Sequence, residues 1–228
     1  LAVEIAAAVV EACAPYNVPV TLKMRTGWCQ EHKNAVQLAR QFEAVGIQML
    51  TVHGRTREQG YRGEAEYDTI AAVKAAVRVP VVANGDITSP EKARAVLAAT
   101  GADALMVGRA AQGRPWIFRE IGHYLATGEH LAPPLVAEVQ RLLLDHLQDH
   151  YQLYGEATGV RSARKHIAWY VRALPGGEAL RQHINTIEDC SAQWQAVLAY
   201  FAALGQRMDR LPATVAATLH EEQEGFCA

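Results

Sequence analysis

Short apolar runs that end in turn-forming residues recur four times in the first half of the chain. They cover residues 20–25, 48–54, 79–87 and 104–110, and each run predicts a β-strand. Many successive positions in these runs are apolar, which is typical of strands that are covered on both faces of a parallel sheet. The pattern therefore predicts a parallel sheet.

Segments with the helical period lie between these strands. They are residues 34–45, 67–76 and 90–99, and an alanine-rich helical pattern occupies residues 1–14. Thr88 and Ser89 are candidates to cap the last of these helices, and Pro90 suits its first turn. The alternation predicts a βαβαβαβ order and an α/β fold.

Polar residues and glycines gather where each predicted strand ends. They are Lys23 and Arg25, then His53, then Asn84, Gly85 and Asp86, then Gly108 and Arg109. These groups recur at an interval equal to one βα unit of a barrel in which about 250 residues form eight units. In that fold, ligands bind at the carboxyl ends of the strands. We expect the C-terminal half of a TIM (β/α)8 barrel, with about four strands lacking and a site at its rim.

The second half of the chain loses the strand pattern. Pro133 and Pro134 mark a linker, and helical stretches follow at residues 136–153, 159–174 and 190–204. We expect a barrel domain over residues 1–132, an all-α helical domain over residues 133–210, and a flexible tail over residues 211–228.

Composition narrows the class of protein. The chain has 228 residues, is 50% hydrophobic and carries a net charge of −2, which excludes a disordered chain and a generally basic nucleic-acid binder. The four cysteines form neither a C-x-x-C pair nor a disulfide framework, and no apolar run is long enough for a membrane span. We expect a soluble cytoplasmic protein, monomeric and without a membrane partner.

The predicted rim carries residues suited to an anionic ligand. Lys23 and Arg25 point to one side of their strand, where an anionic or electron-rich ligand would compensate them; a solvated surface pair is the alternative. His53 suits a phosphate or a reactive ring. No second metal-ligating residue stands near it at ligand spacing, so no metal is expected. Gly108 and Arg109 suit a phosphate, as does the Asn84-Gly85-Asp86 segment.

One helix of the second half has an apolar and a basic arc. The apolar arc holds Val160, Ala163, Ile167, Tyr170, Val171 and Leu174, and the other holds Arg161, Lys165, Trp169 and Arg172. The surrounding segment is positive in a chain that is negative overall. A basic face that carries a tryptophan suits a nucleic-acid backbone, and a solvated helix face is the alternative.

These residues together resemble the tRNA-dihydrouridine synthases, and most closely their bacterial B-type branch. The matching stretches are residues 20–28, 50–57, 82–87, 106–110 and 164–170, with the sequences VTLKMRTGW, LTVHGRTR, VANGDI, MVGRA and RKHIAWY. The resemblance implies an FMN-dependent oxidoreductase that reduces a uridine of tRNA to 5,6-dihydrouridine, with NADPH reducing the flavin. It also implies a barrel followed by a tRNA-binding helical domain.

The resemblance also implies roles for individual residues. Lys23 is expected at the flavin ring and Arg25 at the uridine or flavin, both as catalytic residues. The expected cofactor-binding residues are Lys23, His53, Asn84, Gly85, Asp86, Gly108 and Arg109. The expected tRNA-binding residues are Arg161, Arg164, Lys165, His166 and Arg172.

The family's general acid is a cysteine in an Asn-x-Gly-Cys-Pro segment, which this sequence does not contain. Cys13 lies in a predicted helix and Cys29 in a loop after a strand, so neither is expected to take that role. Two alternatives remain open. One is a different phosphate-binding barrel enzyme, a lyase or isomerase in which Lys23 forms a Schiff base or transfers a proton. The other is a catalytically inactive RNA-binding fragment.

Overall fold

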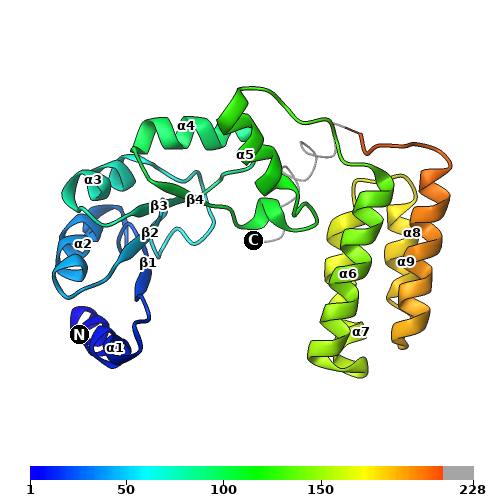
Figure 1. Ribbon diagram of the computed structural model, residues 1–228, viewed down its shortest axis with the longest axis horizontal. Helices are drawn as coiled ribbons and strands as arrows, with labels where there is room; N and C mark the ends of the chain where they lie inside the picture. The colour runs from blue at the N-terminus through cyan, green and yellow to red at the C-terminus, as the bar shows by residue number, and fades with distance from the viewer. Residues whose placement is uncertain (213–228) are drawn as a thin grey trace. The chain divides into compact units, whose positions relative to one another are not determined.

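The chain divides into two compact units, one that ends at Gly108 and one that begins at Arg109 (Figure 1). The structure is a computed structural model that describes residues 1–212. The domain boundary at residue 132 stays a prediction. From residue 213 on, the expected tail lies outside the described residues.

The first unit is built on one sheet of four parallel strands in the order β1-β2-β3-β4 (Figure 1). The strands are β1 Thr21–Arg25, β2 Met49–His53, β3 Val81–Asn84 and β4 Ala104–Met106. All four predicted strands are confirmed. The third ends earlier than its apolar run because Gly85 (φ 131°) and Asp86 (φ 46°) turn the chain out of the sheet.

Helices alternate with the strands of the first unit, and the first helix precedes β1. They are α1 Ala2–Cys13, α2 Ala35–Ala44, α3 Asp68–Ala76 and α4 Pro90–Thr100. In Figure 1 the last three lie one after another along one side of the sheet. Parallel neighbours joined by crossover helices form half of a TIM (β/α)8 barrel, and the predicted fold class is confirmed.

The core of this unit lies between the sheet and its helices. Leu50 and Val52 of β2 are fully buried, and so are Ile70 and Val73 of α3. The helix α4 begins as the sequence predicted, because Pro90 opens it and the Ser89 hydroxyl accepts a hydrogen bond from the Lys92 N–H at 3.1 Å. Of the two cap candidates, Ser89 is the one that caps the helix.

The second unit is helical throughout its described residues. Its helices are α5 Ile117–Thr127, α6 Val136–Tyr154, α7 Glu156–Val171, α8 Gly177–Ile184 and α9 Cys190–Gly205. The three predicted stretches correspond to α6, α7 and α9, whereas α5 and α8 were not predicted. Within residues 1–212, no helix is long and apolar enough to cross a membrane.

The core of the second unit is formed by apolar side chains of α6, α7, α8 and α9. Leu143 of α6, Ile167 and Val171 of α7, and Phe201 of α9 belong to one buried cluster. The entire predicted apolar arc of α7 is buried. Order continues past α9, because Leu211 is 4% exposed and its N–H donates to the carbonyl of Pro134 at 3.0 Å.

Candidate functional site

The carboxyl ends of the strands place four predicted rim residues together. Arg25 pairs in register with His53, His53 with Asn84, and Asn84 with Met106. Lys23 lies two residues before Arg25 on β1. Since alternate residues of a strand point to the same face and paired residues share it, these side chains all belong to one face of the sheet. The structure thus forms a polar row from residues that are far apart in the sequence.

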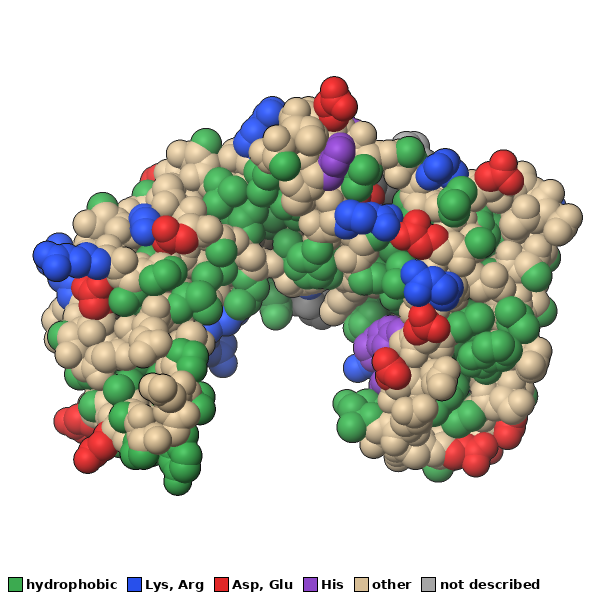
Figure 2. Space-filling model, viewed as in Figure 1, with side chains coloured by type: hydrophobic (Ala, Val, Ile, Leu, Met, Phe, Trp, Pro, Cys, Tyr) green, Lys and Arg blue, Asp and Glu red, His purple; other side chains and the backbone are tan. Residues whose placement is uncertain are grey.

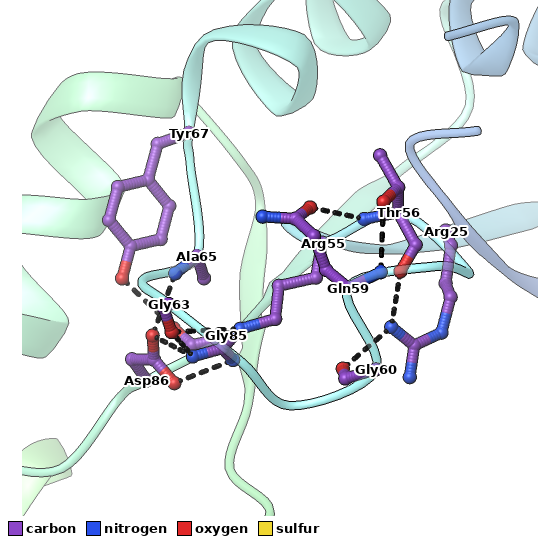
Figure 3. A network of polar contacts seen from close by, with 10 residues as sticks. All are labelled: Arg25, Arg55, Thr56, Gln59, Gly60, Gly63, Ala65, Tyr67, Gly85 and Asp86. Atoms are coloured by element: carbon purple, nitrogen blue, oxygen red, sulfur yellow. Dashed lines mark hydrogen bonds and ion pairs between the residues drawn. The ribbon is translucent and has the colours of Figure 1, made fainter. Parts of the chain in front are cut away.

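Arg25 anchors the loop that follows β2. Its Nη1 donates to the carbonyl oxygens of Thr56 at 2.8 Å and Gly60 at 2.9 Å (Figure 3). The Thr56 N–H in turn donates to Oε1 of Gln59 at 2.8 Å. Arg25 therefore positions the loop, and its contact with a uridine or a flavin stays a prediction.

A buried ion pair joins the same loop to the turn after β3. Arg55 is 2% exposed, and its Nη1 and Nη2 donate to the two carboxylate oxygens of Asp86, each at 2.8 Å (Figure 3). The guanidinium also donates to the Gly63 carbonyl, and the Ala65 N–H donates to Asp86 Oδ2 at 2.8 Å. The bidentate geometry makes this a strong, directional contact.

This ion pair changes the role expected of Asp86. The charge of Arg55, two residues after His53, is compensated by Asp86. Asp86, predicted as a phosphate residue, commits its carboxylate to Arg55 and Ala65. A carboxylate repels a phosphate, so only the backbone of Asp86 is suited to contact one.

Gly85 is required by close packing of the same turn. A side chain there would place its Cβ 2.6 Å from the Cβ of Ala65, and the backbone φ of 131° lies in the region that favours glycine. The Tyr67 hydroxyl donates to the Gly85 carbonyl at 2.9 Å (Figure 3). Burial, together with the charge of Asp86, raises the pKa of Tyr67 to about 12, so this hydroxyl keeps its proton.

Burial and neighbouring cations lower the pKa values of Lys23 and His53. Burial, together with the charges of Arg25 and Lys23, lowers the pKa of His53 to about 4. Burial, and then Arg25, lowers the pKa of Lys23 below its ordinary value. At neutral pH the imidazole is therefore neutral. Lys23 makes no ion pair or hydrogen bond within the described residues.

The last two strand ends differ in how open they are. The Asn84 amide donates to the Met106 carbonyl at 2.8 Å, which orients it beside β4. At Gly108 an added Cβ would meet no atom of the described residues within 4 Å, so a ligand can approach the backbone closely. Arg109 begins a short 3-10 helix in the second unit.

The basic arc of α7 is smaller than the sequence predicted. Arg161 and Lys165 are exposed and make no ion pair within residues 1–212, and Lys165 Nζ lies 5.9 Å from the centre of the Trp169 ring. Arg164 is half-buried, and its Nη2 donates to the Ile187 carbonyl at 2.8 Å, which ties α7 to the segment before α9. Arg172 is half-buried as well.

His166 lies in a cluster of histidines rather than on an open basic face. Its ring centre is 4.9 Å from that of His146 and 5.2 Å from that of His150. Burial, together with the neighbouring His146 and His150, lowers the pKa of His166 to about 4. The sequence interpretation missed His146 and His150, although their spacing of four residues on a helix is a recognisable signal.

Half of a (β/α)8 barrel with a cationic, polar row at its strand ends defines this protein as a member of the TIM-barrel class. The family model described as dihydrouridine synthase (Dus) matches residues 1–204, and the chain belongs to this family.

Curated relatives support this assignment. The chain is 57% identical over 206 residues to tRNA-dihydrouridine synthase B of Pseudomonas putida, covering 90% of this chain and 60% of the relative. It is 59% identical over 185 residues to the protein of that name from Salmonella typhimurium, covering 81% and 58%. The chain thus spans about 60% of the length of these relatives. Among solved structures, GGGPS from Thermoplasma volcanium matches with a TM-score of 0.36 and 14% identity, covering 55% of this chain and 56% of that chain.

Proposed function

We propose that the complete protein is a cytoplasmic enzyme that reduces a uridine of tRNA to 5,6-dihydrouridine, with FMN as its cofactor and NADPH as the reductant. The observation that carries the proposal is the row of Lys23, His53 and Asn84 at the strand ends of a chain that belongs to the dihydrouridine synthase family. The reaction balances as uridine, NADPH and a proton giving dihydrouridine and NADP⁺.

The residues at the rim fit a flavin mononucleotide. Lys23 is a partly desolvated cation without an acidic partner among the described residues, which suits an electron-rich ring that gains negative charge. The open backbone at Gly108 suits a phosphate. When bound, FMN supplies the hydride that reduces the C5–C6 double bond of the uracil.

The residues of the chain hold and orient these groups. The Lys23 ammonium offsets negative charge on the ring, and the neutral His53 and the Asn84 amide provide hydrogen bonds without adding charge. Gly108 and Arg109 are assigned to the phosphate. No residue of this chain is assigned as the acid that protonates the uracil, since Cys13 lies in α1 and the thiol of Cys29 lies 3.0 Å from Nδ1 of His32.

The Lys23→Ala substitution is expected to slow uridine reduction more than it weakens FMN binding. The lysine charge acts on the reactive ring, and removing one such electrostatic interaction costs about 100-fold in rate. FMN affinity is expected to fall less than about 5-fold, because the phosphate interactions remain. Single-turnover oxidation of the reduced protein by tRNA measures the rate, and fluorescence titration measures the affinity.

Lys74→Ala is the matched control, because it removes a lysine of α3 that pairs with Asp103 at 2.7 Å on the outer side of the unit. It is expected to change neither quantity. If Lys23→Ala weakened FMN binding as much as it slowed reduction, Lys23 would serve only as an anchor for the cofactor.

The double substitution Arg161→Gln with Lys165→Gln is expected to weaken tRNA binding and reduce its salt dependence. Removing one cation that neutralises a phosphate should lower the slope of log affinity against log salt by about one unit. FMN affinity should not change, since both residues belong to α7 of the helical unit. Filter binding of tRNA at several salt concentrations provides the measurement.

A matched control is Arg141→Gln with Arg181→Gln. These arginines are also exposed on the helical unit, but Arg141 pairs with Asp145 and Arg181 with Glu178, so their charges are already compensated. An equal decrease of slope in this control, or an unchanged slope in the first variant, would contradict the assignment of Arg161 and Lys165 to tRNA.

The proposal as a whole is tested by assaying the complete protein for dihydrouridine formation in tRNA that lacks this nucleoside. We expect a bound flavin and NADPH-dependent product. A protein that retained no flavin would favour the lyase or isomerase alternative. Tight tRNA binding with flavin bound but without product would favour an inactive RNA-binding protein.

A further inference from the structure

Three histidines of the helical unit converge between α6 and α7. His146 and His150 lie one turn apart on α6, and His166 faces them from α7. One ring nitrogen of each lies within 4.8 Å of the other two. Figure 2 shows histidine side chains at the surface of the helical unit. His146 and His166 are half-buried, so ions can reach the cluster from these two side chains.

We propose that His146, His150 and His166 bind one divalent transition-metal ion, with Zn²⁺ as the best fit. Three imidazoles with a water in the fourth position form a known type of tetrahedral zinc site. Zinc–nitrogen distances of about 2.0–2.1 Å require the ligand nitrogens to lie about 3.3 Å apart. The nitrogens lie within 4.8 Å of one another, so metal binding requires the half-buried side chains of His146 and His166 to rotate and close the remaining separation.

The hydrogen bonds of His150 prepare its ring for this role. Oγ of Ser162 donates to the Thr158 carbonyl at 2.6 Å, so its oxygen is left as an acceptor for Nε2 of His150 at 2.7 Å. In the tautomer in which His150 donates its Nε2–H to Ser162, the lone pair of Nδ1 is available to a metal. Histidines that bind metals commonly donate their second ring N–H to an oxygen in this way.

Aromatic rings and one cation surround the cluster. Aromatic rings flank it, with the ring centre of Tyr154 4.6 Å from that of His150 and the ring centre of Trp169 4.9 Å from that of His166. These rings contact the imidazoles of His150 and His166. The positive charge of Lys165 acts on both His150 and His166 and lowers the affinity of the proposed site for a cation.

A bound ion would tie α6 to α7 by side chains as well as by their packed cores. A ligand that binds only the folded state stabilises it, so the unfolding temperature of the helical unit should rise with Zn²⁺ concentration. The expectation that no metal binds rested on the surroundings of His53 in the other unit, and this cluster is separate from them.

The test uses the full chain, purified without a histidine tag and treated with a chelator. Calorimetric titration with ZnCl₂ should show one ion per chain. His146→Gln should weaken binding at least ~10-fold, and Ser162→Ala should weaken it about 10- to 100-fold by releasing the His150 ring. Far-UV circular dichroism verifies that both variants remain folded. His146 is chosen because its side chain is not buried.

Two controls separate this site from other metal-binding groups. Cys29, Glu31 and His32 form a second group within ligand distance, so Cys29→Ser should leave Zn²⁺ affinity unchanged. His183→Gln, which removes an exposed histidine of α8, should also leave it unchanged. A Co²⁺ complex should lack the charge-transfer absorption of a thiolate ligand.

The proposal is overturned by any of three results. They are a wild-type chain that binds no Zn²⁺ in the titration, a folded His146→Gln variant with unchanged affinity, and abolished binding in Cys29→Ser. None of these results bears on the proposed uridine reduction, because the two proposals rest on different units.

Discussion

The Asp86→Ala substitution is expected to lower the free energy of unfolding of the first unit by about 3–5 kcal/mol, because it leaves the guanidinium of Arg55 buried without its counter-charge. Arg55 is 2% exposed and donates to both oxygens of Asp86. The substitution also removes the acceptor of the Ala65 N–H. Hydrogen exchange of the amides of β2 and β3 reports the stability of this unit separately from the helical one.

Two further variants show whether the buried charge is the cause. Lys74→Ala breaks the more exposed ion pair with Asp103 on the same unit and should cost less than about 1 kcal/mol. Replacing both partners, as Arg55→Met with Asp86→Leu, should restore part of the stability, since no uncompensated charge is left. A cost for Asp86→Ala no larger than that for Lys74→Ala would show that the pair contributes little.

The Ile167→Asp substitution is expected to unfold the helical unit. Ile167 is fully buried in the core cluster with Leu143 of α6 and Phe201 of α9, and a carboxylate there would have no partner. Burying an unpaired charge costs more than about 4 kcal/mol, which is a large part of the stability of a small unit. Absence of exchange protection in α6, α7 and α9, with protection kept in β2 and β3, is the expected result.

Conservative and surface changes on the same helix provide the controls. Ile167→Val should cost about 0.5–1.5 kcal/mol, because it removes one methylene from a packed site. Lys165→Asp introduces the same carboxylate two residues away on the exposed side and should leave the unit folded. Equal unfolding by Lys165→Asp would show that the apolar arc of α7 is not what holds the helix in place.

Hydrophobic periodicity was sufficient to predict most of the fold. The apolar runs and their spacing correctly predicted all four strands and their parallel order, because a strand buried on both faces requires consecutive apolar residues. The same reasoning correctly predicted the buried arc of α7. It missed α8, whose eight residues are too few to show a clear period.

The individual roles of charged residues were harder to predict. Arg25 was a candidate ligand at a strand end, yet it donates to backbone carbonyls of a loop. Asp86 was a candidate phosphate residue, yet its carboxylate is paired with Arg55. On α7, Arg164 stands next to the exposed Lys165 in a basic segment, yet it donates to Ile187. Sequence alone shows that a residue is charged but not which distant acceptor it meets.

The sequence by itself determined the α/β class, the order of the strands, the helical second half and the row of Lys23, His53 and Asn84, because these depend on local periodicity and on the side from which parallel strands end. Only the tertiary structure decided which polar groups bind one another. The Arg55 and Asp86 pair joins loops 31 residues apart, and the three histidines meet across two helices. Such contacts depend on how separate helices, strands and loops pack. A buried polar group needs a hydrogen-bond partner, and no local sequence pattern identifies which distant residue provides it.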